Sequence, residues 1–308
     1  MKISYIIPLY NEEESITELY TVLKNVADRI DTDYEIIFVD DGSTDKSTAK
    51  IASLTQTDDK VKLISFRKNT GKSIALQTGF NASTGEIVIT LDADLQDDPT
   101  QIPKLLAKMD EGYDLVSGWK ENRKDPLNRL ILTKIFNTIV SSFSGFSLHD
   151  FNCGLKVYRK ELIHELNIYG ELHRFIPVIA YNMGFLVAEV PVVHQPRKYG
   201  KSKYGIGRIP KGFLDFLTIL FLTNYATRPL HLFGLIGALL FGTGLLSGLY
   251  LTYLKLMGET IGNRPLLFLT MLLVVSGFQF IFTGLLAEML LYLSPKHKIP
   301  IKQKIGLD

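Results

Sequence analysis

The chain has 308 residues but a single cysteine, Cys153, and a single tryptophan, Trp119. One cysteine cannot form an internal disulfide, so the composition fits a reducing compartment. The formal net charge of +2 is too small to indicate a nucleic-acid-binding surface. The first residues, MKISYIIPLYNEEES, turn acidic after too short an apolar run for the core of a signal peptide, and they favour a β-strand instead.

Two common nucleotide-binding motifs are also missing. The segment TGKS, Thr70 to Ser73, resembles the end of a P-loop, but Phe66 stands where GxxxxGK[ST] requires glycine. No GxGxxG follows an expected strand, so the dinucleotide fingerprint is absent. These absences exclude the P-loop ATPase and NAD-binding classes.

Hydrophobic residues make up 46% of the chain, and the mean hydropathy is +0.13. The excess is concentrated in two uncharged runs, Pro229 to Leu254 and Pro265 to Ala287. Each is longer than the roughly 20 residues that a helix needs to cross a bilayer. We predict two transmembrane helices; the alternative is a pair of long buried helices in a soluble core.

Basic residues lie before the first run and after the second, two flanks that share one side of a membrane if both runs cross it. Lys296, Lys298, Lys302 and Lys304 follow the second run, and seven cations precede the first: Arg197, Lys198, Lys201, Lys203, Arg208, Lys211 and Arg228. The positive-inside tendency therefore predicts a multi-pass protein of the inner (plasma) membrane with both flanks cytoplasmic. Between Asp215 and Arg228 the uncharged stretch is too short to span, so residues 211–228 are expected to form an interfacial helix.

The N-terminal half alternates short hydrophobic strands with helices, which are expected to open at Asn11 and near Ser43. This alternation predicts an α/β domain with a largely parallel sheet. Ligands bind beyond the carboxyl ends of such strands. The acidic segments DDGSTD (Asp40 to Asp45) and DADLQDD (Asp92 to Asp98) both follow strands, so we expect them to share one cleft.

The segment DADLQDD offers oxygen ligands at alternate positions. In extended backbone Asp92, Asp94 and Gln96 would project to one side, an arrangement that suits Mg²⁺ or Mn²⁺ bridging to a diphosphate. We expect Asp97 and Asp98 to cap the following helix and stay solvated. In the segment VDDGS, the Asp41 carboxylate can accept a hydrogen bond from a nucleotide base N–H or a ribose hydroxyl. The alternative is that it caps a helix.

Five segments together carry a resemblance to a known family: SYIIPLYNEEESI, FVDDGSTD, NTGKSIALQTGFNASTGEIVITLDADLQDDP, DFNCGLKVYR and RKYGKSKYG. In this order they resemble the family 2 glycosyltransferases of the membrane-anchored polyisoprenyl-phosphate branch, which includes dolichol-phosphate mannose synthase and the bactoprenol glucosyltransferases. The likeness covers about residues 3–210 by motif and the two apolar runs by layout. It implies the fold called GT-A, a Rossmann-like α/β nucleotide-sugar domain.

The resemblance also implies roles for individual residues. Asp94 and Gln96 match the metal-binding positions, and Asp150 matches an acidic residue beside the donor sugar. The implied nucleotide-sugar contacts are Pro8, Tyr10, Asn11, Glu12, Asp41, Lys72, Asp92 and Ala93, and the implied lipid-phosphate contacts are Arg123, Arg129, Arg197, Ser202 and Lys203. Arg197 and Lys203 join Asp94 and Asp150 as implied catalytic residues. Some bacterial relatives have an aspartate where this chain has Gly154, which leaves open which acid serves there.

The implied reaction is inverting transfer of a hexose to a polyisoprenyl phosphate such as undecaprenyl phosphate. UDP-glucose is the expected donor and GDP-mannose the alternative. The expected organisation is a catalytic domain over residues 1–210, the interfacial helix over 211–228 and a two-helix membrane region with a basic cytoplasmic tail over 229–308; a homo-oligomer is possible. A processive polysaccharide synthase would carry a QxxRW motif, which is absent around Trp119. A membrane nucleotide-sugar binding protein without catalysis is the alternative from another class.

Overall fold

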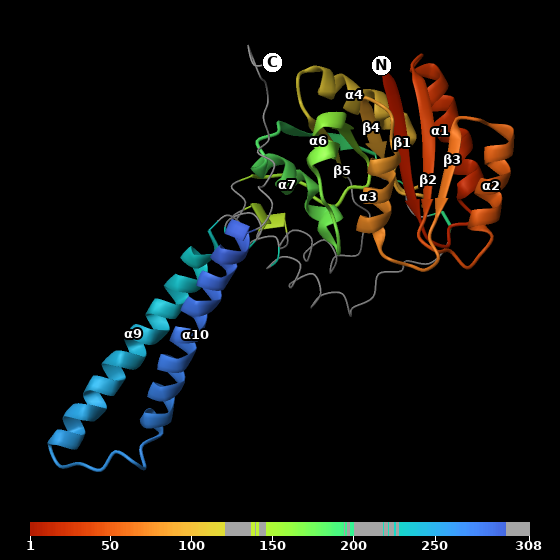
Figure 1. The fold of residues 1–308 in the computed structure, drawn as a ribbon. Coiled ribbons are helices and arrows are strands. Elements are labelled where there is room, and N and C mark those ends of the chain that lie inside the picture. The colour runs from red at the N-terminus through yellow and green to blue at the C-terminus, as the bar shows by residue number, and fades with distance from the viewer. Residues whose placement is uncertain are drawn as a thin grey trace. The chain divides into compact units, whose positions relative to one another are not determined.

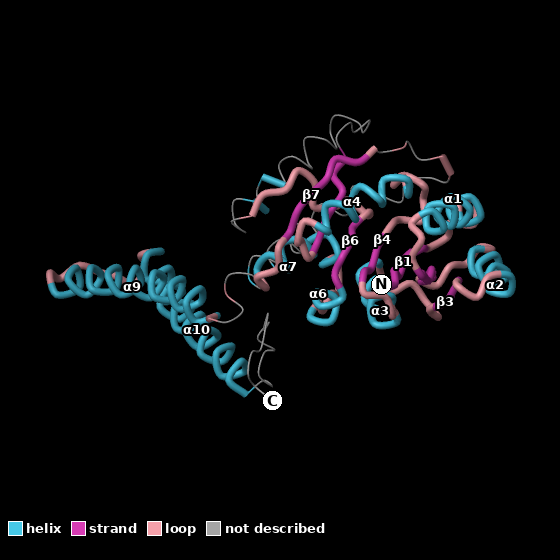
Figure 2. The backbone as a smooth tube through the Cα atoms, turned by 90° about the horizontal axis from the view of Figure 1, so that it is seen from above, coloured by secondary structure: helices cyan, strands magenta, loops and turns pink. Residues whose placement is uncertain are grey.

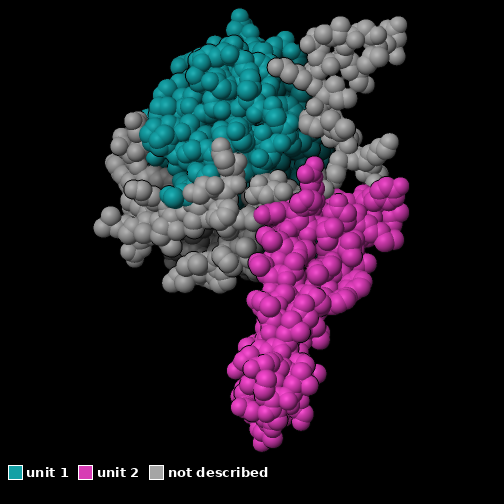
Figure 3. Space-filling view, turned by 90° about the vertical axis from the view of Figure 1, so that its left-hand side faces the viewer, with its two compact units in different colours: residues 1–219, 300–308 teal, residues 220–299 magenta. Residues whose placement is uncertain are grey.

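The computed structural model describes residues 1–120, 146–193 and 228–293, together with residues 137, 138, 140, 141, 195, 198, 199, 218, 221 and 225. The chain divides into two compact units, one of residues 1–219 and 300–308 and one of residues 220–299 (Figure 3). The expected boundaries at residues 210 and 228 lie next to residues outside this description and stay predictions.

A seven-stranded sheet forms the centre of the first unit (Figure 1). Its order is β3-β2-β1-β4-β6-β5-β7, with β1 Lys2–Leu9, β2 Asp33–Asp40, β3 Val61–Ser65, β4 Ile87–Thr90, β5 Leu115–Lys120, β6 Lys156–Arg159 and β7 Val187–Val192. Neighbouring strands run parallel except at β6, which is antiparallel to β4 and β5. The predicted α/β domain with a largely parallel sheet is confirmed. Because β6 is reversed, its first residue, Lys156, pairs with the last residue of β4, Thr90.

Helices cover both faces of this sheet (Figure 2). One face packs against α1 Ile16–Arg29, α2 Ser47–Thr57 and α4 Ile102–Asp110, and the other against α3 Lys72–Ala82, α6 Lys160–Glu165 and α7 Ile176–Asn182. Short 3-10 helices, η1 Pro99–Gln101 and η2 Leu172–Phe175, precede α4 and α7. Side chains alternate along a strand, so Tyr5 and Ile7 of β1 belong to the first core while Ile6 belongs to the second.

Two helices begin later than the sequence pattern indicates. Helix α1 starts at Ile16 and α2 at Ser47, not at Asn11 and near Ser43. Asn11 has a φ of +52°, which is not helical, and its backbone N–H donates to Ser43 Oγ at 2.8 Å. These residues therefore tie the β1 loop to the β2 loop instead of opening helices.

The second unit contains two long apolar helices, α9 Pro229–Leu256 and α10 Pro265–Leu293. The most apolar 18 residues of each helix have mean hydropathies of 1.9 and 2.2, and both helices are long and apolar enough to cross a membrane. Small residues lie where the helices meet: a Cβ added to Gly277 would come within 2.5 Å of the Phe241 backbone nitrogen. Such small residues allow close backbone packing between membrane helices. Where the start of α9 meets the last turns of α10, the Leu230 N–H donates to Glu288 Oε2 at 3.4 Å.

Candidate active site

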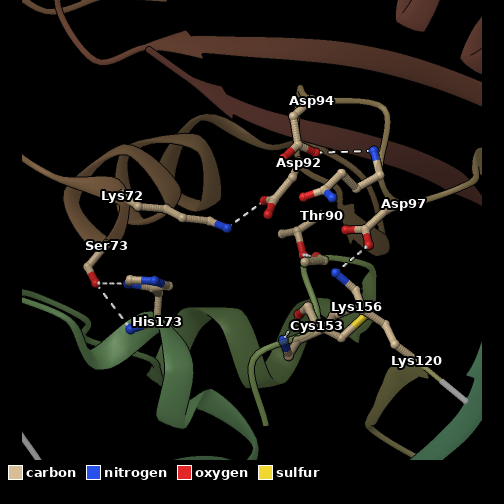
Figure 4. A network of polar contacts seen from close by, with 12 residues as sticks. Lys72, Ser73, Thr90, Asp92, Asp94, Asp97, Lys120, Cys153, Lys156 and His173 are labelled. Atoms are coloured by element: carbon tan, nitrogen blue, oxygen red, sulfur yellow. Dashed lines mark hydrogen bonds and ion pairs between the residues drawn. The ribbon is translucent and has the colours of Figure 1, made fainter. Parts of the chain in front are cut away.

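The carboxylate of Asp92 lies just beyond the carboxyl end of β4 and pairs with a lysine of α3. Lys72 is the first residue of α3, and its Nζ lies 2.5 Å from Asp92 Oδ1 (Figure 4). Burial alone would raise the pKa of Asp92, but the positive charge of Lys72 outweighs burial and holds that pKa at about 2. Asp92 is therefore ionised at physiological pH, and two of the eight predicted nucleotide-sugar residues, Lys72 and Asp92, form one ion pair.

Asp94 and Gln96 follow Asp92 in a turn. Leu95 adopts a φ of +58°, and Asp94 Oδ1 accepts a hydrogen bond from the Gln96 N–H at 3.2 Å (Figure 4). The expectation of extended backbone here is wrong, because this left-handed residue reverses the chain. Within the described residues no three His, Cys, Asp or Glu side chains gather into a metal-binding group. Asp94 and Gln96 offer a carboxylate and an amide oxygen, the ligand types that suit Mg²⁺ or Mn²⁺.

Asp98 behaves as predicted, whereas Asp97 does not. Asp98 accepts from the Thr100 N–H at 2.9 Å and caps η1. Asp97 is only 2% exposed, so its predicted solvated position is wrong. Lys120 Nζ lies 3.4 Å from Asp97 Oδ1 (Figure 4), and neither Asp97 oxygen has a hydrogen-bond partner among the described residues. Burial raises the pKa of Asp97 and outweighs the attraction of Lys120.

Gly154 lies where the carboxylates of Asp92 and Asp97 approach each other. A Cβ at position 154 would lie 2.4 Å from Asp97 Oδ2 and 2.6 Å from Asp92 Cγ. No side chain fits there without displacing an acid, which gives a steric reason for glycine at the position where some relatives carry aspartate. Two acids, Asp92 and Asp97, therefore border this position in the structure, and both come from the segment after β4.

The segment before β6 brings an acid and a lysine to the same edge. Asp150 is 2% exposed, and its Oδ1 accepts from the Asn152 N–H at 3.0 Å. The Lys156 side chain is also buried, and its Nζ donates to the Cys153 carbonyl. Burial lowers the pKa of Lys156, and it raises the pKa of the Cys153 thiol to about 12, so that thiol is not a nucleophile.

Asp41 holds the loop that precedes Lys72. Its Oδ1 accepts from the Thr70 N–H at 2.6 Å and from Thr70 Oγ1 at 3.0 Å, and its Oδ2 accepts from the Gly71 N–H at 2.9 Å. Gly71 has a φ of +101°, a conformation that favours glycine. The carboxylate thus fixes the start of α3, a different element from the α2 helix that directly follows it in sequence.

A buried serine–histidine pair lies behind Lys72. The His173 N–H donates to Ser73 Oγ at 3.1 Å, and Ser73 Oγ lies 2.9 Å from His173 Nδ1 (Figure 4). Burial, assisted by the charge of Lys72, lowers the pKa of His173 well below its usual value. Sequence reasoning missed this histidine, and it missed Lys120 and Lys156 as well. Lys120 ends β5 and Lys156 begins β6, and only the reversal of β6 brings both lysines to the edge of the sheet beyond β4, which no local sequence pattern shows.

The other predicted residues fall into two groups. Pro8 and Ala93 are buried, and Tyr10, Asn11 and Glu12 are half-buried at the end of β1. Asn11 Oδ1 accepts from the Thr44 N–H at 2.8 Å, and the Glu12 N–H donates to Ser47 Oγ at 2.9 Å. Five predicted residues lie outside the described part of the chain: Arg123, Arg129, Arg197, Ser202 and Lys203. All predicted nucleotide-sugar residues thus lie within the described part of the chain, and all predicted lipid-phosphate residues lie outside it, so both sets stay predictions.

A mixed sheet with an acidic turn beyond β4 defines the GT-A class of glycosyltransferase, and solved structures share this fold. Glucosyl-3-phosphoglycerate synthase from Mycobacterium tuberculosis, in complex with Mn²⁺, uridine-diphosphate-glucose and phosphoglyceric acid, matches with a TM-score of 0.56. The identity is 22%, and the match covers 71% of this chain and 78% of that chain. The same enzyme with Mn²⁺, uridine-diphosphate and phosphoglyceric acid also matches with a TM-score of 0.56, at 20% identity over 74% and 81% of the two chains.

Sequence comparison places the chain within this class. Residues 4–166 match the profile described as glycosyl transferase family 2, and the chain belongs to that family. The dodecaprenyl-phosphate galacturonate synthase of Rhizobium johnstonii is 36% identical over 94% of this chain and 88% of its own length. The undecaprenyl-phosphate 4-deoxy-4-formamido-L-arabinose transferase of Proteus mirabilis is 35% identical over 93% of this chain and 87% of its own length. The predicted family and GT-A fold are confirmed.

Proposed function

We propose that this glycosyltransferase moves a sugar from a nucleotide diphosphate to a polyprenyl phosphate at a membrane surface. The observation that carries the proposal is the extent of the likeness: both relatives are named for transfer to a polyprenyl phosphate, and each aligns with more than nine-tenths of the chain. The alignment thus takes in residues of both compact units. A polyprenyl phosphate presents its phosphate at headgroup depth, where a membrane-anchored domain meets it at high effective concentration.

The donor would occupy the edge beyond β1, β2 and β4. Asp92 and the residues near the end of β1 would contact the nucleotide, while Asp41 would act by holding the Thr70–Gly71 turn. Asp94 and Gln96 would hold a divalent cation, which neutralises charge on the leaving diphosphate. Arg197 and Lys203 are proposed to hold phosphate groups of the donor or the lipid.

The acceptor supplies its own nucleophile. The second pKa of a phosphate monoester is about 6, so the lipid phosphate is mostly ionised at neutral pH, and its oxygen can attack the anomeric carbon with inversion. A general base is then not required. We propose that Asp150 positions the sugar or a basic side chain, and that Asp150→Asn lowers kcat without creating a new pH optimum. Recovery of Asp150→Asn activity at high pH would restore the base role.

The donor sugars named for the relatives differ from the sugars expected from the sequence. Glucose was the expectation from sequence, with GDP-mannose as the alternative, but the two relatives are named for galacturonate and 4-deoxy-4-formamido-L-arabinose. Mg²⁺ and Mn²⁺ both fit oxygen ligands. We propose that α9 and α10 span the plasma membrane with the catalytic unit cytoplasmic, as the basic flanking residues indicate.

The test is release of nucleoside diphosphate by the full chain in detergent. Release that requires both Mg²⁺ or Mn²⁺ and a polyprenyl phosphate, over many turnovers and with one donor from a panel of UDP- and GDP-sugars, would support the proposal. Asp94→Asn should abolish this release, while Asp59→Asn, at an exposed position after α2, should not. Stoichiometric nucleotide binding without turnover for every donor would favour the non-catalytic alternative.

A further inference from the structure

His149, the residue directly before Asp150, is held by two neighbouring strands of the sheet. Its backbone N–H donates to Glu189 Oε2 at 2.9 Å, and its ring nitrogen Nδ1 forms a hydrogen bond with Glu189 Oε1. The imidazole also stacks on the Trp119 indole, with ring centroids 4.6 Å apart and an interplanar angle of 22°. Trp119 belongs to β5 and Glu189 to β7. Both strands therefore fix one residue of the segment before β6.

The register of β5 and β7 explains why an indole and a carboxylate meet His149 together. The two strands run parallel, with Ser117 opposite Glu189 and Trp119 opposite Pro191. Side chains alternate between the two faces of a strand, so Trp119 and Glu189 lie on the same face of the sheet in adjacent pairs. A residue that packs on this face beside one of them reaches the other as well.

The contacts of His149 are not explained by burial. Its side chain is 69% exposed, and an exposed pair of this kind contributes little to stability. The same carboxylate nevertheless binds both the backbone and the ring of His149, and the indole sets the plane of the ring. These contacts remove the conformational freedom that an exposed side chain ordinarily keeps. Their main effect is thus to fix the position of the residue.

The fixed position of His149 is passed to Asp150 through the backbone. Among residues 148–151 His149 alone is exposed. Leu148 and Phe151 are buried in the second core, and Asp150 is 2% exposed. The His149 carbonyl accepts from Asn137 Nδ2 at 2.6 Å. With His149 held on one side and Phe151 on the other, the Asp150 carboxylate has a defined orientation.

We propose that His149, held by Glu189 and Trp119, is a positioning residue that orients the Asp150 carboxylate for sugar transfer. This inference rests on the function proposed above and on the role given there to Asp150. A displacement of about 1 Å in an active site can cost about 10²-fold in rate. Loss of the His149 contacts should therefore lower kcat while donor binding stays nearly the same.

The experiment uses the full chain in detergent and three readouts: transfer to undecaprenyl phosphate, the stoichiometry of nucleotide binding, and tryptophan fluorescence. The variants are His149→Ala and Glu189→Ala. His164→Ala and Glu161→Ala, at exposed positions of α6, are the matched controls. Trp119 is the only tryptophan of the chain, so its emission reports the contact with His149 without any need for turnover.

We expect His149→Ala and Glu189→Ala each to lower kcat by on the order of 10- to 100-fold, with donor KM and binding stoichiometry nearly unchanged. Both should change the Trp119 emission, and the two control variants should not. His149→Ala combined with Asp150→Asn should lower kcat no further than Asp150→Asn alone, because the imidazole acts through that carboxylate. Losses that multiply in the combined variant would show a merely structural role and overturn the inference.

An active parent with an unchanged kcat in His149→Ala overturns the inference while the proposed function stands. An unchanged Trp119 emission in His149→Ala overturns the contact on which the inference depends. If His149→Ala does not fold, Glu189→Ala decides by the same comparison with Asp150→Asn. A parent that transfers no sugar from any donor removes the proposed function and, with it, the role given to His149, whether or not the emission confirms the contact.

Discussion

Replacement of Gly154 by alanine tests whether the two carboxylates beside it are as tightly packed as the structure indicates. The new Cβ would meet Asp97 Oδ2 at 2.4 Å and Asp92 Cγ at 2.6 Å, distances that real Cβ atoms do not show, so at least one acid must move. Asp97 is buried beside Lys120, and Asp92 is paired with Lys72. Neither acid can move without weakening an ion pair, and overpacking of this kind costs about 1–3 kcal/mol.

For a unit of this size, about 1 kcal/mol lowers Tm by roughly 2–4 °C. We therefore expect Gly154→Ala to lower the Tm of the full chain in detergent by several degrees and to weaken nucleotide-sugar binding, since Asp92 is displaced. Gly262→Ala is the control, because a Cβ at that exposed glycine meets no atom within 4 Å. An unchanged Tm together with unchanged donor affinity for Gly154→Ala would refute the packing argument.

Three further predictions concern the ion pairs and the helix pair. Lys72→Met should raise the pKa of Asp92 from about 2 by about 1–3 units, so the acid limb of nucleotide-sugar binding, followed by calorimetry against pH, should move upward; an unmoved limb would exclude Asp92 as the titrating group. Glu35 is buried, but hydrogen bonds from Lys62, Ser4 and Thr84 outweigh burial and hold its pKa at about 2. The pKa of a glutamate in the unfolded chain is about 4.3. The ionised Glu35 carboxylate therefore stabilises the fold fully above about pH 4.3, and this stabilisation is lost as the pH falls towards 2. Glu35→Gln should thus lower stability at pH 7 by about 2 kcal/mol and flatten the pH dependence of Tm between about 4.3 and 2, whereas a parallel curve would contradict this. Gly277→Leu should separate α9 from α10, because a Cβ at position 277 would meet the Phe241 backbone nitrogen at 2.5 Å. The readout is disulfide formation in the double variant Ser247→Cys and Thr270→Cys, since the two native hydroxyls lie 2.9 Å apart. Adding Gly277→Leu should reduce this disulfide, whereas adding Gly242→Leu should not, because a Cβ at position 242 meets no atom within 4 Å.

The fold was largely predictable because its signals are local. Short apolar strands, alternating helices and two long uncharged runs depend on neighbouring residues alone, and they gave the parallel part of the sheet and both apolar helices. The reversed strand β6 was not predictable, because its direction depends on pairing with β4 and β5. That pairing is between segments far apart in the sequence.

The location of Asp92, Asp94 and Gln96 beyond a strand end was predictable from sequence, whereas the location of Lys120 and Lys156 beside the same acids was not. Asp92, Asp94 and Gln96 lie within one short motif, and the strand before them fixes where they go. Lys120 and Lys156 enter from β5 and β6, so sequence alone shows no reason for either lysine to lie near the acids that follow β4. The burial of Asp97 was misjudged for the same reason, because it depends on the left-handed turn at Leu95 and on packing against Gly154.

Hydrogen bonds and one ion pair connect the end of β2, the start of α3 and the end of β4. Asp41, at the end of β2, fixes Thr70 and Gly71, and these two residues set the start of α3 and so the position of Lys72, which pairs with Asp92. Asp41 can therefore influence donor binding without touching the nucleotide. If that is its role, Asp41→Asn should weaken the turn and raise the donor KM in the same way for UDP- and GDP-sugars, because the turn does not read the base. A change confined to one base would instead show that Asp41 contacts the nucleotide directly.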